Sequence, residues 1–224
     1  MTIISAFITN LGKYNEGELA GEWHEFPTTR EAMFKTFEEI GIDGVCYEEF
    51  FITDYDCEAK GLSEHLGEYA GVDELNYLAS KIESLTEWEL EAYEAAVEAG
   101  DYSTDIKDLI NLTENLGCFD YMPGIDGYYD LGYYWVEESG CYDTKGMGSL
   151  TNYIDYERFG RDICLDEGGT FASRGYVRNN GDNFIESYDG ECVPEEYRVF
   201  SMPRQKEPEH SASRQKVSQN RGAR

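Results

Sequence analysis

The chain has 224 residues, 41% of them hydrophobic and 14% aromatic, which is enough apolar material to build folded cores. Its formal net charge is −28, from 46 Asp and Glu against 18 Lys and Arg. A field of this sign repels nucleic acids and anionic membranes and attracts basic protein surfaces. The composition therefore argues against a nucleic-acid or membrane partner and favours a basic protein.

Cysteine usage and hydropathy indicate the compartment. The six cysteines are widely scattered and form no CxxC motif. The N-terminus lacks the basic start of a signal peptide, and no apolar stretch approaches the roughly 20 residues that span a bilayer. We expect a cytoplasmic protein with reduced thiols.

Residues 1–68 are predicted to form a small sheet-plus-helix N-terminal domain. β-Branched and apolar patterns predict strands at residues 2–9, 20–26 and 47–53. The glycine-containing polar stretch at residues 11–17 is predicted to be a loop. Thr28 and Glu31 have the spacing of a capping box, which predicts a helix start, and Gly41 is its predicted end.

Residues 69–117 are predicted to form a helical, acidic middle domain. Its first apolar positions follow the 3.6-residue period of an amphipathic helix. Thr86 and Glu89 form a second capping box, and the helix that they open is expected to end before Gly100. A third helix is expected from about Thr104.

Residues 118–200 are predicted to form a mixed α+β C-terminal domain. Helices are expected at residues 125–138 and 150–159. Gly160 is the predicted end of the second helix. Strands of a β-hairpin are expected near residues 170–177 and 183–188. Asn180-Gly181 is the predicted turn, and residues 201–224 are predicted to be a disordered basic tail, so the fold class is α+β.

No catalytic or metal-binding motif is found in the sequence. The three histidines are far apart, and there is no HExxH motif, Walker loop or nucleophile elbow. Two acidic segments, residues 54–65 and 126–137, resemble calcium loops in part but lack the glycine required at loop position 6. We expect no enzymatic activity, cofactor or metal, and a hydrolase with an unrecognised carboxylate pair stays an alternative.

The stretch between Lys81 and Lys107 contains acids and no base, whereas a solvated helix usually carries Glu–Lys pairs four residues apart. Like-charged pairs at that spacing weaken a helix by roughly 0.2–0.5 kcal/mol each. A solvated helix face is the simplest interpretation of such a run, and a surface that imitates phosphates is the functional one. The candidate acids are Glu83, Glu87, Glu89, Glu91, Glu94, Glu98, Asp101 and Asp105.

The charge total is large enough for imitation of DNA. Residues 203–224 hold six bases and two acids, which leaves 12 bases and 44 acids, a net charge of −32, in residues 1–202. Duplex DNA carries one charge per roughly 1.7 Å, so this charge matches about 54 Å of duplex, or about 16 base pairs. Two chains would match about 30 base pairs.

Four segments in register resemble the ArdA antirestriction protein family. They are residues 6–23 (AFITNLGKYNEGELAGEW), 52–56 (ITDYD), 71–76 (GVDELN) and 152–162 (NYIDYERFGRD). The likeness runs in order over about residues 5–188, and several motifs in order are far more specific than any one of them. The chain departs from the family pattern by a longer segment near residues 38–47 and by the residues after 188.

The resemblance implies an elongated, three-domain, acidic homodimer whose surface carboxylates imitate the phosphates of bent DNA. Such proteins occupy the DNA groove of type I restriction–modification enzymes and help mobile genetic elements enter a bacterial host. Further candidate acids in the third domain are Asp126, Asp130, Glu137 and Glu138. The resemblance places the antirestriction motif near the dimer contact, at Tyr153, Ile154, Asp155, Tyr156, Phe159, Gly160, Arg161 and Asp162.

Two further interpretations stay open beside this one and the hydrolase. An acidic adaptor or sequestering partner for some other basic, nucleic-acid-binding protein would show no preference for restriction enzymes. A salt-adapted protein with an unrelated function would carry the same excess of acids.

Overall fold

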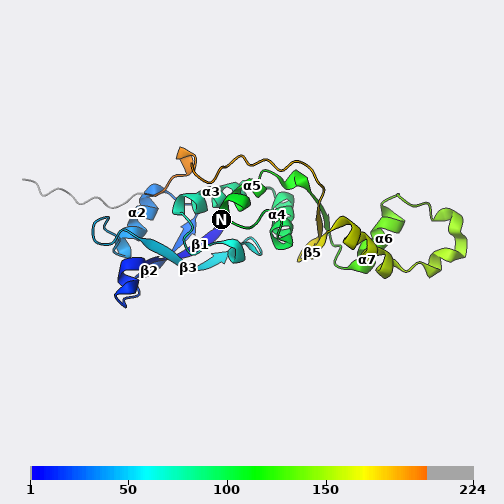
Figure 1. Cartoon of the computed structure of the whole chain (residues 1–224), viewed down its shortest axis with the longest axis horizontal. Coiled ribbons are helices and arrows are strands. Elements are labelled where there is room, and N and C mark those ends of the chain that lie inside the picture. The colour runs from blue at the N-terminus through cyan, green and yellow to red at the C-terminus, as the bar shows by residue number, and fades with distance from the viewer. Residues whose placement is uncertain (1, 201–224) are drawn as a thin grey trace, which may run out of the picture.

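The computed structural model describes residues 2–200 and is mixed α+β, as predicted. The elements follow one another along a long axis (Figure 1). An N-terminal sheet lies at one end, a group of helices lies in the middle, and residues 124–168 form the other end. The predicted disordered tail at residues 201–224 lies outside the described residues.

The first sheet is antiparallel with the order β2-β1-β3. Its strands are β1 (Ile4–Asn10), β2 (Gly21–Phe26) and β3 (Phe50–Cys57). Ile4, Ala6 and Ile8 alternate along β1 and are fully buried. They share a core with Met33 and Phe37 of helix α2 (Arg30–Glu39), so one helix packs with a three-stranded sheet, as predicted.

Helix α2 begins one residue later than its predicted capping box requires. Thr29, not Thr28, is the N-cap, and its hydroxyl accepts a hydrogen bond from the backbone N–H of Ala32. The Thr28 hydroxyl is instead 2.9 Å from Nε2 of the buried His24. The Thr28 hydroxyl is thus bound to His24 and not to the helix N-terminus, where Thr29 takes the capping role.

Two other boundaries in this part differ from the prediction. Residues 11–17 do not form a plain loop, because they begin with helix α1 (Leu11–Asn15). The Asn10 side chain caps this helix by accepting from the backbone N–H of Lys13. The third strand begins at Phe50 instead of residue 47.

The middle helices are α3 (Val72–Glu83), α4 (Glu87–Ala99) and α5 (Ile106–Leu112). The capping box of Thr86 and Glu89 is confirmed, and Gly100 ends α4 in the left-handed conformation. Tyr93 of α4 is fully buried in one core cluster that also contains residues of the first sheet. The first two predicted domains therefore share a core, and the division into three domains stays a prediction.

The second sheet is antiparallel with the order β4-β6-β5. Its strands are β4 (Phe119–Pro123), β5 (Thr170–Ala172) and β6 (Gly175–Asn179). The predicted hairpin around Asn180-Gly181 is wrong, because β6 pairs with β5 and β4 and residues 183–188 form no strand. The Asn179 and Asn180 side chains accept from the backbone N–H groups two residues on, which turns the chain out of the sheet.

The far end contains α6 (Tyr128–Tyr133), a π-helical turn (Tyr134–Glu138) and α7 (Tyr156–Glu167). Short 3-10 segments occur at Leu62–His65, Leu116–Cys118, Lys145–Tyr153 and Glu195–Tyr197. The predicted helix at 125–138 begins at Tyr128, and the one at 150–159 is wrong. Asp155 is the N-cap of α7 and accepts from the backbone N–H of Arg158, so Gly160 lies inside that helix instead of after it.

Residues 180–200, which we call the C-terminal strap, run back along the molecule past α5 and α3 toward α2 (Figure 1). Two buried asparagines of the α5 region hold the strap backbone with paired hydrogen bonds. Asn115 binds the N–H and C=O of Ile185 at 2.8 and 2.9 Å, and Asn111 binds those of Tyr188 at the same distances. These side-chain amides therefore satisfy the backbone hydrogen-bonding groups of the strap, as a neighbouring strand does in a sheet.

The strap is also fixed on α3. Asn76 donates to the C=O of Tyr197 at 2.9 Å, and the Tyr197 ring lies 4.6 Å from that of Tyr77. Asp73 accepts from the backbone N–H groups of Val199 and Phe200, each at 2.6 Å.

We predict that Asn111→Ala lowers the free energy of unfolding by about 2 kcal/mol or more, because it leaves the N–H and C=O of Tyr188 buried without partners. Chemical denaturation measures the loss, and hydrogen exchange locates it, with faster exchange at the Tyr188 amide. Asn152→Ala is the control, since Asn152 is exposed. Unchanged exchange at Tyr188 would show that Asn111 does not hold the strap.

Candidate functional site

The eight candidate acids between Lys81 and Lys107 do not form one continuous face. Glu94 is 2% exposed, so the expectation of a surface carboxylate is wrong for this residue. Its carboxylate contacts the guanidinium of Arg174 at 2.5 Å and accepts from the backbone N–H of Lys60. The nearby Glu94 charge raises the pKa of Arg174.

Two more acids of α4 face the turn between β5 and β6. Glu91 contacts Arg174 at 3.0 Å, and Glu98 accepts from the backbone N–H and the hydroxyl of Ser173 at 2.5 and 2.7 Å. Glu91, Glu94 and Glu98 therefore attach the second sheet to α4. These three acids have an internal structural role that the run of like charges did not predict.

Two further acids of the run cap the N-termini of helices and have exposed side chains. Glu89 completes the capping box, and its pKa is lowered because it accepts from the backbone N–H and hydroxyl of Thr86. Asp105 is the N-cap of α5 and accepts from the N–H of Asp108. Both side chains are exposed, and so are Glu83, Glu87 and Asp101.

The four candidate acids at the far end of the molecule are all exposed. They are Asp126, Asp130, Glu137 and Glu138. Glu137 also accepts a hydrogen bond of 2.6 Å from the Tyr156 hydroxyl, and this contact raises the pKa of Tyr156 to about 12. Tyr156 therefore stays a protonated donor near neutral pH.

A group of acids in the N-terminal part was not among the candidates. Asp54, Glu64 and Glu68 are exposed and line a shallow hollow of about 310 Å³ beside β3. The alternation of Asp54 and Asp56 along one strand is a signal that could have identified its edge, since residues two apart share a face. The exposed acids thus extend from the first sheet to α6.

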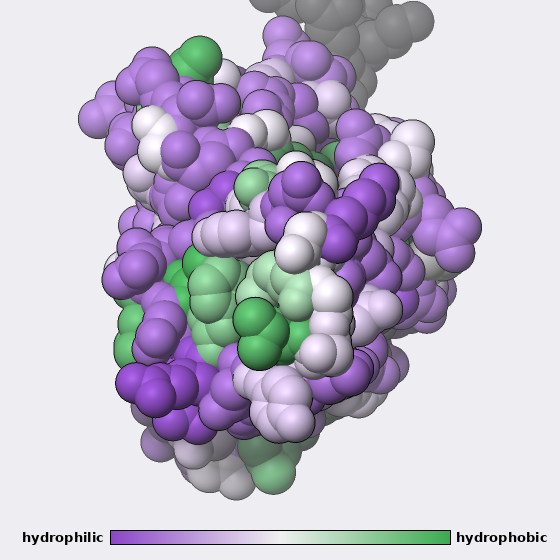
Figure 2. Space-filling view, turned by 90° about the vertical axis from the view of Figure 1, so that its right-hand side faces the viewer, coloured by the Kyte–Doolittle hydropathy of each residue, from purple (hydrophilic) through white to green (hydrophobic). Residues whose placement is uncertain are grey.

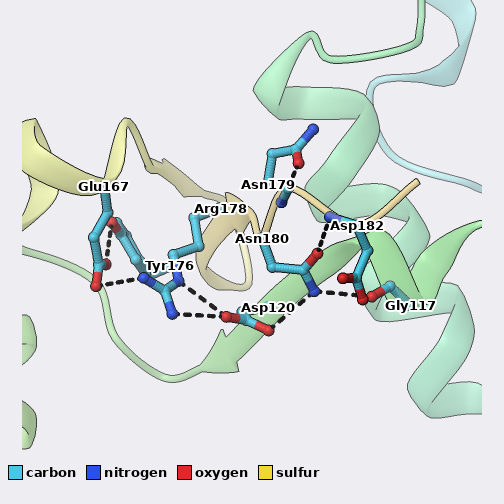
Figure 3. Close-up of polar contacts among 9 residues, drawn as sticks. Gly117, Asp120, Glu167, Tyr176, Arg178, Asn179, Asn180 and Asp182 are labelled. Atoms are coloured by element: carbon cyan, nitrogen blue, oxygen red, sulfur yellow. Dashed lines mark hydrogen bonds and ion pairs between the residues drawn. The ribbon is translucent and has the colours of Figure 1, made fainter. Parts of the chain in front are cut away.

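One basic residue, Arg178, lies where three chain segments meet. Arg178 on β6 binds Asp120 of β4 at 2.8 Å and Glu167 of α7 at 2.5 Å (Figure 3). Tyr176 donates to the same Glu167, and both its burial and this neighbouring charge raise its pKa. Figure 3 shows that Arg178 and Tyr176 both point toward Glu167, so this cluster joins the second sheet to α7.

The residues predicted to form the antirestriction motif lie just before α7 and along the first part of this helix. Tyr153 is 83% exposed, and Asp162 is also exposed. Phe159 packs edge-on against Tyr142 at 5.5 Å, and Arg161 lies 5.6 Å from the centre of the Tyr128 ring. Ile154 is half-buried just before Asp155, the N-cap described above. The segment therefore has a packed side and an exposed side.

Gly160 is buried at the closest approach of α7 to α6. A Cβ atom built on Gly160 would lie 1.8 Å from the backbone oxygen of Tyr128, and one on Gly132 would lie 2.0 Å from that of Tyr156. No side chain fits at either position. The two glycines allow direct backbone contact between the helices, and this contact fixes the motif on α6.

Figure 2 views this far end of the molecule, where apolar surface gathers in one area and hydrophilic residues surround it. The exposed large apolar residues of the segment that connects α6 to α7 are Tyr142, Met147, Leu150 and Tyr153. Exposed apolar clusters with a polar rim mark surfaces that bind other proteins.

We predict that Gly160→Ala destabilises the packing of α6 on α7, because its methyl group must displace the backbone of Tyr128. The expected loss is about 1–3 kcal/mol or more, as for overpacked cores. Thermal unfolding measures the loss. The control is Gly146→Ala in the same end of the molecule, where an added Cβ meets no atom within 4 Å. Equal melting temperatures for the two variants would show that the close contact is not needed.

No group of three or more potential ligands among residues 2–200 could hold a metal ion. Of the helices in that range, not one is long and apolar enough to cross a membrane.

Comparison with known proteins identifies the family. No curated protein matches the chain. The family model described as antirestriction protein (ArdA) matches residues 6–178, which is more than three quarters of the chain. The matched range contains nearly all of both sheets, the helices α1 to α7 and the close contact at Gly160. The C-terminal strap lies beyond the matched region. The chain therefore belongs to the ArdA family of antirestriction proteins.

Proposed function

We propose that this protein imitates DNA and occupies the DNA-binding groove of a type I restriction–modification enzyme. In that position it blocks restriction, and it competes with DNA for modification at the same groove. It needs no catalytic residue or cofactor, because it acts by steric and electrostatic competition. Membership of the ArdA family supports the antirestriction part of this proposal.

The observation that carries the proposal is the unequal use of the two charge types. Of the 12 Lys and Arg residues within 2–200, seven form ion pairs inside the molecule, and the pairs of Lys81, Lys107, Arg174 and Arg178 connect separate chain segments. More than half of these bases are thus paired inside the molecule, whereas exposed carboxylates extend from the first sheet to α6. The elements that carry these carboxylates follow one another along the long axis (Figure 1). An elongated, negatively charged surface complements a basic groove.

We also propose that the protein acts as a homodimer in the bacterial cytoplasm, as the family resemblance implies. The apolar area on the far end (Figure 2) supports a contact there, next to the predicted motif residues 153–162. Two chains joined at this end would form one longer acidic surface. A three-domain organisation belongs to the same proposal.

We predict that the variant Glu87→Gln/Asp101→Asn binds a purified type I enzyme about fivefold more weakly at low salt, because each surface charge contributes up to about 1 kcal/mol. The loss shrinks as salt is raised, since exposed charges are screened. Inhibition of DNA cleavage, titrated at several salt concentrations and repeated with excess specific DNA, measures the effect.

The matched control is Glu195→Gln/Glu196→Gln, which removes the same charge from exposed positions on the strap outside the family match. We expect a smaller loss for this control. If the affinity of the natural protein for the enzyme is the same at low and at physiological salt, electrostatic imitation of DNA is contradicted. Equal inhibition of unrelated basic proteins would instead favour the acidic-adaptor function.

A further inference from the structure

A groove beside α4 is not explained by imitation of phosphates. It has a volume of about 610 Å³ and lies between the first half of α4, the strand β4 and the π-helical turn. Four aromatic residues line it: Trp88 of α4, Phe119 and Tyr121 of β4, and Tyr134 of the π-helical turn. The groove is open to solvent.

Trp88 is the most unusual residue of this groove. Its side chain is 55% exposed although it lies on a helix that buries most of its length, and its ring centre is 5.3 Å from that of Tyr121. Exposure of so large an apolar side chain is unfavourable in water. A DNA mimic that acts through carboxylates alone has no use for it, whereas tryptophan is among the residues that most often dominate binding energy at protein interfaces.

The surroundings of Trp88 select a cationic ligand. Glu87 and Glu89 flank it in the sequence and are exposed, and Glu89 lines the groove. A planar aromatic surface with carboxylates at its edge suits a guanidinium group, which stacks on the ring and donates hydrogen bonds to the acids at the same time. An apolar ligand would gain nothing from the acids.

The protein uses the same chemistry internally next to this groove. The guanidinium of Arg178 lies 5.9 Å from the centre of the Trp135 ring while it binds Asp120, which itself lines the groove. Arg161 lies in a similar way over Tyr128. Among the cation–aromatic contacts found in residues 2–200, none involves Trp88, so its exposed face is open to a cation from another molecule.

We propose that this groove receives an arginine side chain from the basic DNA-binding surface of the inhibited enzyme, stacked on Trp88 and bound at its edge by Glu89. This inference rests on the proposed function and adds a specific contact to it. Contacts between exposed charges weaken with salt, whereas a cation enclosed against aromatic rings is screened much less. The groove therefore supplies a part of the affinity that persists at higher salt.

The test compares the natural protein with Trp88→Ala, Trp88→Leu and Trp88→Phe in binding to a purified type I enzyme, at about 50 mM and about 200 mM salt. Trp88→Ala and Trp88→Leu should each weaken binding about tenfold, by a similar factor at both salts, because both remove the aromatic face. Trp88→Phe should retain part of the affinity. The control, Trp23→Ala, removes a tryptophan of 44% exposure on β2 and should change affinity less than about twofold.

Leucine is apolar and favours helices, so Trp88→Leu reports on binding even where Trp88→Ala fails to fold. Natural affinity for Trp88→Leu would overturn the inference, because an apolar contact would then suffice. A loss that disappears at the higher salt, or a change in the sedimentation mass of the protein alone, would also overturn it. Failure of the natural protein to bind any type I enzyme would instead refute the proposed function, and the arginine contact with it.

Discussion

The structure depends on folding a chain whose carboxylates far outnumber its bases. Residues 1–202 contain 44 acids and 12 bases, and like charges weaken any compact state. The few bases therefore contribute most where segments meet. Arg174 joins the β5–β6 turn to α4, Arg178 joins β6 to β4 and α7, and Lys107 joins α5 to Glu186 of the strap. Each of these contacts also pairs an acid with a base.

Neutral contacts add to these ion pairs. The strap carries exposed acids, and buried amides of Asn111, Asn115 and Asn76 bind its backbone without adding charge. At the far end, Gly132 and Gly160 bring α6 and α7 into backbone contact. Because these interactions do not use charged groups, salt that screens the surface leaves them intact. The fold is thus held in part by contacts that salt does not weaken.

Two kinds of surface coexist on this scaffold. Exposed acids extend from the hollow beside β3 to α6 and give a field that any basic groove would meet. The aromatic groove around Trp88 and the apolar area at the far end are local, and they depend on shape. Long-range charge governs encounter, whereas local packing decides which partner stays bound. An antirestriction protein that meets many basic proteins in a cell needs both.

The sequence by itself determined the α+β class, the three strands of the first sheet, and the α4 cap at Thr86, because these follow from local periodicity and capping. Only the tertiary structure decided that Glu94 is buried, because Arg174 reaches it from 80 residues away. Long-range packing likewise decided the partners of β6 and the close contact of Gly160 with α6. The sequence gives the number and order of the charged residues. Whether each charged side chain is exposed or buried depends on the segments that pack against it.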